Sequence, residues 1–211
     1  SRLDDAQLAE LQQSHGLVSA TANPDAGGKD NSDFLASIND GIGLSVNLHA
    51  DGPDGIIGWR ARKHAGLIDI DKPASQPISR FWEAVRTDDL TGGGLVLNPD
   101  EFYILASREF VCVPSSYAAE MRAYDTRVGE FRAHYAGFFD PGFGMSDIGA
   151  APTRAVLEVR SHDVPFLIEH GQIVCRLVYE PMADVPEALY GAPGSGSNYQ
   201  SQGLKLAKHF C

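Results

Sequence analysis

The chain has 211 residues, of which 43% are hydrophobic and 21% charged, and its formal net charge is −11. This ordinary globular balance excludes a disordered or membrane-spanning chain, and a chain of this length fits one domain with one core. The acidic excess disfavours binding to nucleic acid or to an anionic membrane, so a phosphorylated ligand needs local donors or a metal ion.

The amino terminus carries acidic groups rather than a signal-peptide pattern, so we expect a cytoplasmic protein. Ser1 in place of an initiating Met suggests a fragment or a processed chain. Cys112, Cys175 and Cys211 are widely spaced and form no C-x-x-C pair. We therefore expect reduced thiols, with neither a disulfide framework nor a zinc site.

A short helix is predicted from Asp4 to His15, because Asp4 or Asp5 can cap its start and Gly16 can end it. The polar run from Ala20 to Asp33 has no periodicity and predicts a loop. We interpret residues 1–40 as a helix and linker.

Beyond residue 40 the pattern changes to short β-type runs separated by turn residues, which predicts an antiparallel barrel or sandwich. One helical insert is expected around Phe81–Arg86. Residues 41–190 would form the barrel, and the Gly- and Ser-rich residues 191–211 would form a flexible tail or lid. The runs are GLSVNLHA, GIIGWRAR, GLIDID, GLVLNPDEFYILASREFVCVP and RAVLEVRSHDVPFLIEHGQIVCRLVYEP.

Seven short motifs follow one another between Ile42 and Gly203, and together they resemble the ordered motifs of dCTP deaminases and their dUTPase relatives. The resemblance implies an all-β, dUTPase-like distorted antiparallel barrel of the β-clip or jelly-roll type, with short helices. It is nearest to the carboxy-terminal half of the double-length bacterial deaminase. The motifs are Leu44-Ser45-Val46-Asn47-Leu48, Pro99-Asp100-Glu101, Pro114-Ser115-Ser116, Asp140-Pro141-Gly142-Phe143-Gly144, Leu157-Glu158, His170-Gly171-Gln172 and Asn198-Tyr199-Gln200-Ser201-Gln202.

Glu158 is the predicted catalytic residue. It is an acid in the apolar run Ala-Val-Leu-Glu-Val, where reduced solvation would raise its pKa toward that of a working base. Alternation alone leaves open whether it instead faces outward as a solvated strand residue. In the family it resembles, the matching Glu takes a proton from the water that attacks C4 of cytosine.

The remaining site residues come from the resemblance. Ser115 and Ser116 would hold phosphate oxygens, Asp140 a deoxyribose hydroxyl, and the backbone near Ala136 the attacking water. The alternatives are an ordinary Ser-rich turn, a carboxylate that only caps its turn, and a tail with incidental polar groups. Other substrate-binding candidates are Val156, Leu157, Tyr190, Tyr199 and Gln202.

Two arginines of the R-S-S-x-x-R motif are replaced by Pro114 and Ala119, and Asn198 replaces a tail lysine. Serine hydroxyls alone do not replace guanidinium groups on a triphosphate. We therefore hypothesise that a homologous amino-terminal half supplies the missing cations, in a homotrimer or pseudo-hexamer.

The predicted function is hydrolytic deamination of dCTP to dUTP, with Mg²⁺ accompanying the triphosphate. The zinc deaminase signature H-x-E with P-C-x-x-C is absent from the sequence, which predicts a route without zinc. The alternatives are dUTP diphosphatase activity, a catalytically incomplete half that serves trimer assembly or regulation, and an unrelated ligand-binding jelly roll.

Overall fold

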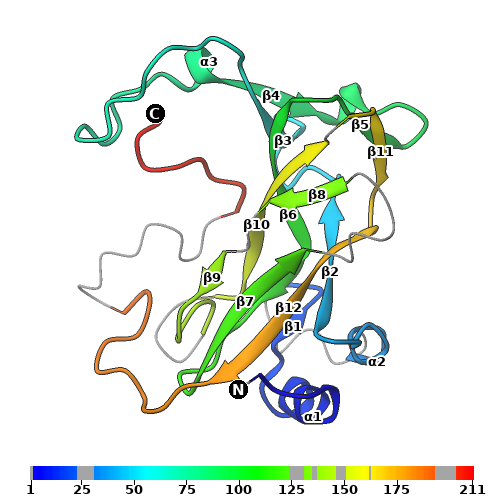
Figure 1. Ribbon diagram of the computed structural model, residues 1–211, viewed down its shortest axis with the longest axis vertical. Helices are drawn as coiled ribbons and strands as arrows, with labels where there is room; N and C mark the ends of the chain where they lie inside the picture. The colour runs from blue at the N-terminus through cyan, green and yellow to red at the C-terminus, as the bar shows by residue number, and fades with distance from the viewer. Residues whose placement is uncertain are drawn as a thin grey trace.

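A computed structural model describes residues 2–22, 31–123, 131–134, 137–145, 151–161, 163–192 and 203–211. Most of the described regular structure is β, in a curled sheet that runs the length of the molecule (Figure 1). Every pairing between its named strands is antiparallel, so the predicted all-β antiparallel fold is confirmed.

The main sheet has the strand order β4-β3-β6-β2-β12-β7-β9, while β10 pairs with β6 and β8, and β1 pairs with β6. β5 and β11 form a separate pair. The bounds are β1 Val18–Ser19, β2 Ile42–Asn47, β3 Ile56–Ala61, β4 Trp82–Arg86, β5 Gly94–Leu97, β6 Phe102–Val111, β7 Tyr117–Ala123, β8 Phe131–His134, β9 Phe138–Phe139, β10 Thr153–Ser161, β11 Phe166–Glu169 and β12 Ile173–Pro181.

The core lies inside the curl of the sheet. β10 alternates strictly, because its odd-numbered residues from Thr153 to Ser161 are buried and its even-numbered residues face outward. β2 is instead buried at every position. The continuous apolar run of β6 is likewise buried on both faces over most of its length, so this strand lies under further structure on its outer side.

The predicted amino-terminal helix is confirmed as α1, Asp5–His15, with Asp4 as N-cap and Gly16 in the left-handed conformation at its end. Gln12 is 2% exposed, and its amide holds β1 through two hydrogen bonds to Val18, of 2.9 and 3.0 Å. The helix is thereby fastened to the barrel.

The expected helix at Phe81–Arg86 is wrong. The helix α3 covers only Ile78–Phe81, and Trp82–Arg86 forms β4, which pairs with β3. Pairing with β3 decides the conformation, because a run this short suits either structure. The remaining short helices are α2, Asn31–Ala36, and η2, Thr87–Asp89.

The apolar run GLIDID is not a strand, contrary to expectation. Leu67 is 92% exposed and Ile70 74% exposed, and no described strand pairs with this segment. The alternating apolar pattern did not produce a strand here, because no described strand lies beside the segment to pair with it. α2 also begins inside the loop predicted for Ala20–Asp33, and residues 23–30 of that loop lie outside the described chain.

The end of the chain packs against the segment around Gln76. Backbone hydrogen bonds of 2.9–3.1 Å join residues 208–211 to residues 74–78, and Figure 1 shows the two segments side by side. Leu206 is 5% exposed, and the Phe210 ring lies 5.7 Å from that of Trp82. This docking of residues 203–211 was not visible in the Gly- and Ser-rich sequence around them.

The three cysteines are free thiols, as expected. Burial raises the pKa of the Cys175 thiol far above its ordinary value, so this side chain acts as a small apolar core residue.

Candidate functional site

Glu158 lies on the outer face of β10. Its neighbours Leu157 and Val159 point into the core at 0% and 1% exposed, whereas the Glu158 side chain is exposed in the single chain. The reduced solvation expected for it is therefore not provided by this chain alone. Leu157, a predicted substrate contact, offers a ligand only its backbone.

A row of side chains crosses three strands at Glu158. Glu158 is directly opposite Ile104 of β6, and Ile104 is opposite Trp59 of β3. The next row joins Val156 of β10 to Ala106 of β6. Directly opposed residues share a face and strands lie about 4.8 Å apart, so the backbones of Glu158 and Trp59 are roughly 10 Å apart.

A pocket of about 250 Å³ opens on this same face. Trp59 and Ala106 contribute to its wall, with His49 from the segment after β2 and Gly203–Leu204 from the end of the chain. The predicted tail residue Gln202 directly precedes Gly203 but lies outside the described residues, as do Tyr199 and Ala136. The pocket thus combines an aromatic wall with the face that carries the candidate base.

His49 stacks on His170, with ring centroids 3.7 Å apart and an interplanar angle of 12°. The Leu48 N–H donates to Nδ1 of His170 at 3.1 Å, which leaves the proton of the neutral ring on Nε2. Burial, with the nearby charge of His49, lowers the pKa of His170. The His170 motif therefore positions a neutral imidazole behind the pocket.

Arg160 is a cation that the sequence analysis missed. It follows Glu158 on the same exposed face, with its guanidinium 5.3 Å from the ring centre of Phe102. The alternation V-L-E-V-R is the signal that places it beside Glu158. Arg154, on the same face, is instead held by Asp51 in a two-point ion pair of 2.9 Å at each oxygen.

The Asp140 turn forms a second cluster with two other predicted residues. The Gly142 N–H donates to the carbonyl of Val113 at 3.0 Å, just before Pro114-Ser115, and the Tyr190 N–H donates to the carbonyl of Pro141 at 2.9 Å. The turn that follows the exposed Asp140 therefore lies beside the segments that carry Ser115 and Tyr190.

This cluster stands at one end of β10 and Glu158 farther along the strand. A Cβ on Gly144 would lie 3.2 Å from the Cα of Pro152, which immediately precedes β10. Glu158 lies six residue steps along the strand from Pro152, a distance of roughly 20 Å. A single ligand that reached both would have to lie along β10.

The positions where the family motif has arginines belong to the core. Ala119 is 2% exposed and lies on β7 between Phe139 of β9 and Tyr179 of β12, and Pro114 is buried. These positions offer no room for a solvated guanidinium. Neither Ala119 nor Pro114 is exposed to a ligand in this chain, so any cations for the phosphates have to come from other positions.

Two further motifs have structural roles. The buried Glu109 accepts hydrogen bonds from the backbone N–H and the hydroxyl of Ser45, at 2.7 and 2.6 Å. Glu101 accepts from Tyr103 at 2.6 Å and from Asn98 at 3.1 Å. Although burial opposes the shift, these bonds and the charge of Arg60 lower the pKa of Glu101.

Within the described residues, no three His, Cys, Asp or Glu side chains are grouped so as to hold a metal ion. No described helix is long and apolar enough to cross a membrane.

Residues 4–210 match the protein family described as 2'-deoxycytidine 5'-triphosphate deaminase (DCD), C-terminal domain. The chain is similar to "dCTP deaminase, dUMP-forming" of Methanobrevibacter smithii, at 31% identity over 63% of this chain and 65% of the relative. It is 29% identical to the protein of that name from Methanothermobacter thermautotrophicus, over 65% of this chain and 68% of the relative.

A solved structure, the 2'-deoxycytidine 5'-triphosphate deaminase of Agrobacterium tumefaciens, is 47% identical and superposes with a TM-score of 0.73. The match covers 89% of this chain but 51% of that protein, so the chain spans about half of its solved relative.

Proposed function

The chain belongs to the family of carboxy-terminal domains of dCTP deaminases, and on that premise we propose that the protein containing it hydrolyses dCTP to dUTP and ammonia, with Glu158 as the base. The observation that carries the proposal is the position of Glu158. It is an exposed carboxylate on the face of the sheet where Trp59, two strands away, lines a pocket. The family relationship supplies the reaction class.

In the proposed step, the Glu158 carboxylate takes a proton from a water molecule as the water oxygen bonds to C4 of cytosine. The C4–N4 bond then breaks and the amino group leaves as ammonia. One proton of the water ends on the ammonia and the other on N3 of the uracil. One positioned carboxylate contributes roughly 10²- to 10⁴-fold in such a transfer, so orientation of the base must supply much of the remainder.

We place the base of the nucleotide beside Glu158 and Trp59. The roughly 20 Å of strand between Glu158 and the Asp140 cluster exceeds the distance between a base and its own sugar, so Asp140 would contact the sugar from a neighbouring copy of the chain. Ser115 and Ser116 then face the phosphates, and Tyr190 lies beside the sugar. Mg²⁺ would arrive with the triphosphate as part of the substrate.

Closure of the site by another subunit is part of the proposal. A general base works best where bulk water is excluded, and the single chain leaves Glu158 exposed. A second copy in a trimer, or a homologous amino-terminal half in the longer protein, would cover it and provide cations for the phosphates. Tyr199, Gln202 and the backbone of Ala136 remain proposed contacts.

The second candidate is combined deamination and diphosphate hydrolysis, with dUMP as the product. The printed names of both archaeal relatives include "dUMP-forming", which favours it. Product analysis separates the two: dCTP turnover that yields ammonia and dUTP supports the first, and equal amounts of ammonia and pyrophosphate support the second. If dCTP yields neither ammonia with dUTP nor ammonia with pyrophosphate, both proposals are refuted.

The alternative of a structural or regulatory half is tested by the chain alone. Turnover of dCTP by the isolated 211 residues would exclude it. If only the protein that contains both halves turns over dCTP, and Glu158→Gln there leaves the rate unchanged, the structural role holds.

A further inference from the structure

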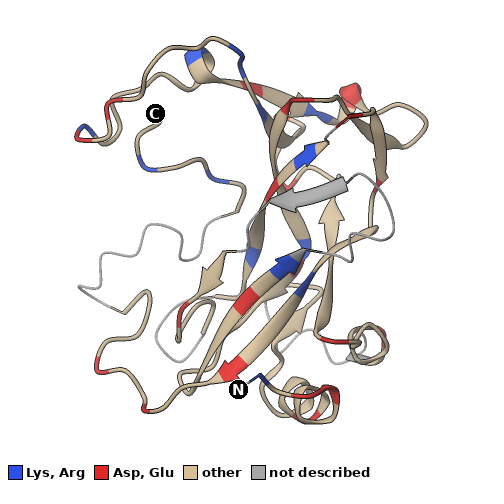
Figure 2. Cartoon of the chain, viewed as in Figure 1, with Lys and Arg blue, Asp and Glu red and all other residues tan. Residues whose placement is uncertain are grey.

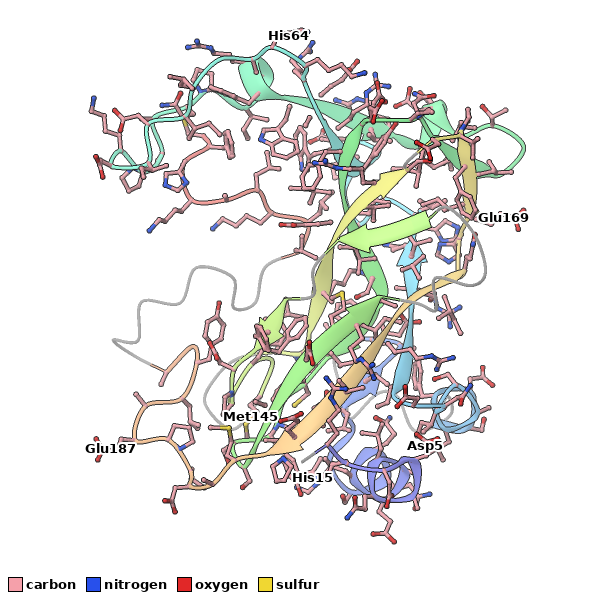
Figure 3. All side chains as sticks on the ribbon, in the orientation of Figure 1. Asp5, His15, His64, Met145, Glu169 and Glu187 are labelled. Atoms are coloured by element: carbon pink, nitrogen blue, oxygen red, sulfur yellow. The ribbon has the colours of Figure 1, made fainter. Side chains whose placement is uncertain are left out.

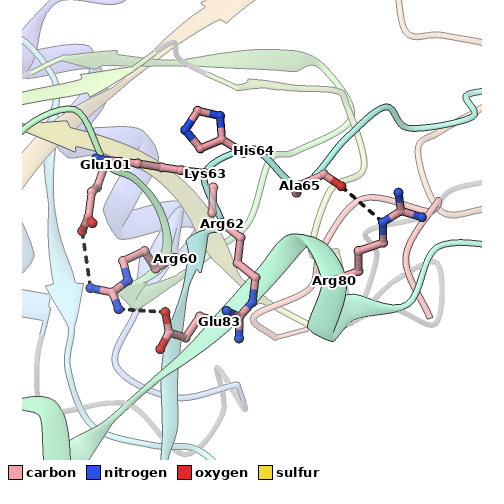
Figure 4. Close-up of a pocket in the computed structure, with 9 residues that line it drawn as sticks. Arg60, Arg62, Lys63, His64, Ala65, Arg80, Glu83 and Glu101 are labelled. Atoms are coloured by element: carbon pink, nitrogen blue, oxygen red, sulfur yellow. Dashed lines mark hydrogen bonds and ion pairs between the residues drawn. The ribbon is translucent and has the colours of Figure 1, made fainter.

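A pocket of about 390 Å³ lies between the end of β3 and α3, and cationic side chains dominate its wall (Figure 4). Arg60, Arg62, Lys63 and Arg80 line it together with the carboxylates of Glu83 and Glu101. Four cations against two carboxylates leave a charge of +2, before any protonation of His64. Figure 2 shows these blue segments at one end of a chain whose net charge is −11.

Both carboxylates of the pocket form ion pairs with the same cation, Arg60. Arg60 donates to Glu83 at 2.8 Å and lies 3.4 Å from Glu101. These contacts raise the pKa of the Arg60 guanidinium still further above its ordinary value. Arg60 therefore offsets one of the two negative charges, and the +2 excess of the pocket wall comes from Arg62, Lys63 and Arg80 against the carboxylate charge that remains.

The other cations keep their donors available. The side chains of Arg62 and Lys63 are exposed and form no hydrogen bond or ion pair with any described residue. Arg80 donates a hydrogen bond from its Nε to the carbonyl of Ala65 at 3.2 Å, and its guanidinium lies 5.3 Å from the ring centre of Phe81, so among the described residues its two terminal nitrogens form no hydrogen bond. Figure 4 shows these side chains coming from the strand end, the following turn and α3.

This pocket is separate from the face that carries Glu158. Arg60 follows Trp59 on β3, and successive strand residues point to opposite faces, so the two side chains belong to different surfaces. Along the long axis of the molecule, His64 lies at one end and Met145, which follows the Asp140 turn, lies in the other half (Figure 3). The proposed deamination does not use this pocket.

We propose that this pocket binds the phosphate groups of a polyphosphate, either free or carried by a nucleotide. Guanidinium forks pair with phosphate oxygens through two parallel hydrogen bonds, and a lysine adds a mobile point charge. Three open cations from three segments suit a ligand with several charged groups better than a single carboxylate. The pocket volume accommodates more than one phosphate.

The test is calorimetric titration of the whole chain with inorganic tripolyphosphate and, in a second arm, with dCTP. The double variant Arg62→Gln/Lys63→Gln removes two open cations from exposed positions. Its matched control, Arg2→Gln/Lys72→Gln, removes one arginine and one lysine that do not line the pocket. Thermal unfolding verifies that all proteins are folded.

We expect one tripolyphosphate per chain, binding that weakens as salt is raised, and at least a tenfold loss in the pocket variant with less than a twofold change in the control. Tighter pocket-dependent binding of dCTP than of tripolyphosphate would identify a nucleotide as the ligand, and equal binding a free polyphosphate. Absence of binding, or equal losses in both double variants, would overturn the proposal. Glu158→Gln should leave tripolyphosphate binding unchanged, so failure here is distinct from failure of the deaminase proposal.

Discussion

Glu158 on β10 and Trp59 on β3 lie on one face of the sheet, with Ile104 of β6 directly between them. Neither residue is near the other in sequence, and the pairing of β6 with both strands sets their separation. The relationship gives the candidate base a neighbouring aromatic surface on which a planar pyrimidine can stack.

Replacement of Trp59 by Leu should weaken dCTP binding by about tenfold, because stacking of a base on an aromatic ring contributes about 1–3 kcal/mol. Trp59 and Trp82 are the two tryptophans of the chain. A fluorescence change on dCTP addition should therefore persist in Trp82→Phe and vanish in Trp59→Leu. Persistence of the signal in Trp59→Leu would place the base elsewhere.

Replacement of Gly144 by Ala should destabilise the protein by more than about 3 kcal/mol, because the backbone of Val111 cannot move aside. The added Cβ would lie 3.2 Å from the Cα of Pro152 and closer still to the Val111 carbonyl oxygen, at a φ of +69°. Gly92→Ala is the control: its φ is +61° with nothing within 4 Å, so it should cost about 1 kcal/mol. Urea unfolding measures both, and equal losses would mean that the close approach at Gly144 does not matter.

Ser45→Ala should lower the free energy of unfolding by about 2 kcal/mol, because it removes a hydroxyl donor from the buried Glu109 carboxylate. Ser14→Ala removes a hydroxyl from the exposed side of α1 and should change stability by less than about 0.5 kcal/mol. Denaturant unfolding compares the two variants. A loss at Ser45 no larger than at Ser14 would show that Glu109 does not depend on the hydroxyl.

His170 should make the protein sensitive to mild acid. Its folded-state pKa is lowered by burial and by the charge of His49, so the unfolded chain takes up the proton first. The stabilising contribution is fully present above the unfolded value of about 6.5 and is lost as the pH falls below it. His170→Asn, whose side-chain oxygen can accept from Leu48, should lose less stability than the parent protein between neutral and mildly acidic pH.

Unfolding curves across this pH range provide the measurement, and His15→Asn, at an exposed imidazole, is the control that should follow the parent. If His170→Asn lost more stability than the parent as the pH falls, the pKa of His170 would not be lowered by folding.

The sequence predicted local structure where the signal was local. The Asp4 cap and the Gly16 stop define α1 within a few residues, and turn residues separate most of the strands. The errors at 66–71 and 81–86 have one cause: a short apolar pattern becomes a strand only where a partner strand lies beside it. That partner is distant in sequence and was not visible in the pattern.

For the candidate site, too, the sequence predicted what depends on local motifs and did not predict what depends on long-range pairing. Motif order identified the family and singled out Glu158, but alternation could not decide which face of β10 would be buried. The closeness of Trp59 to Glu158 depends on the long-range register through Ile104. The packing of Leu206 and Phe210 depends likewise on contacts far along the chain.

Glu158 is the proposed base, so the most direct test compares dCTP turnover by the parent protein and by Glu158→Gln, in the protein that contains this chain. Ammonia release should fall by about 10²- to 10⁴-fold with dCTP binding retained, because Gln keeps the shape of the side chain but cannot take the proton. Glu169→Gln, at an exposed acid on β11, should leave turnover within twofold. Turnover by Glu158→Gln within twofold of the parent would contradict the assignment.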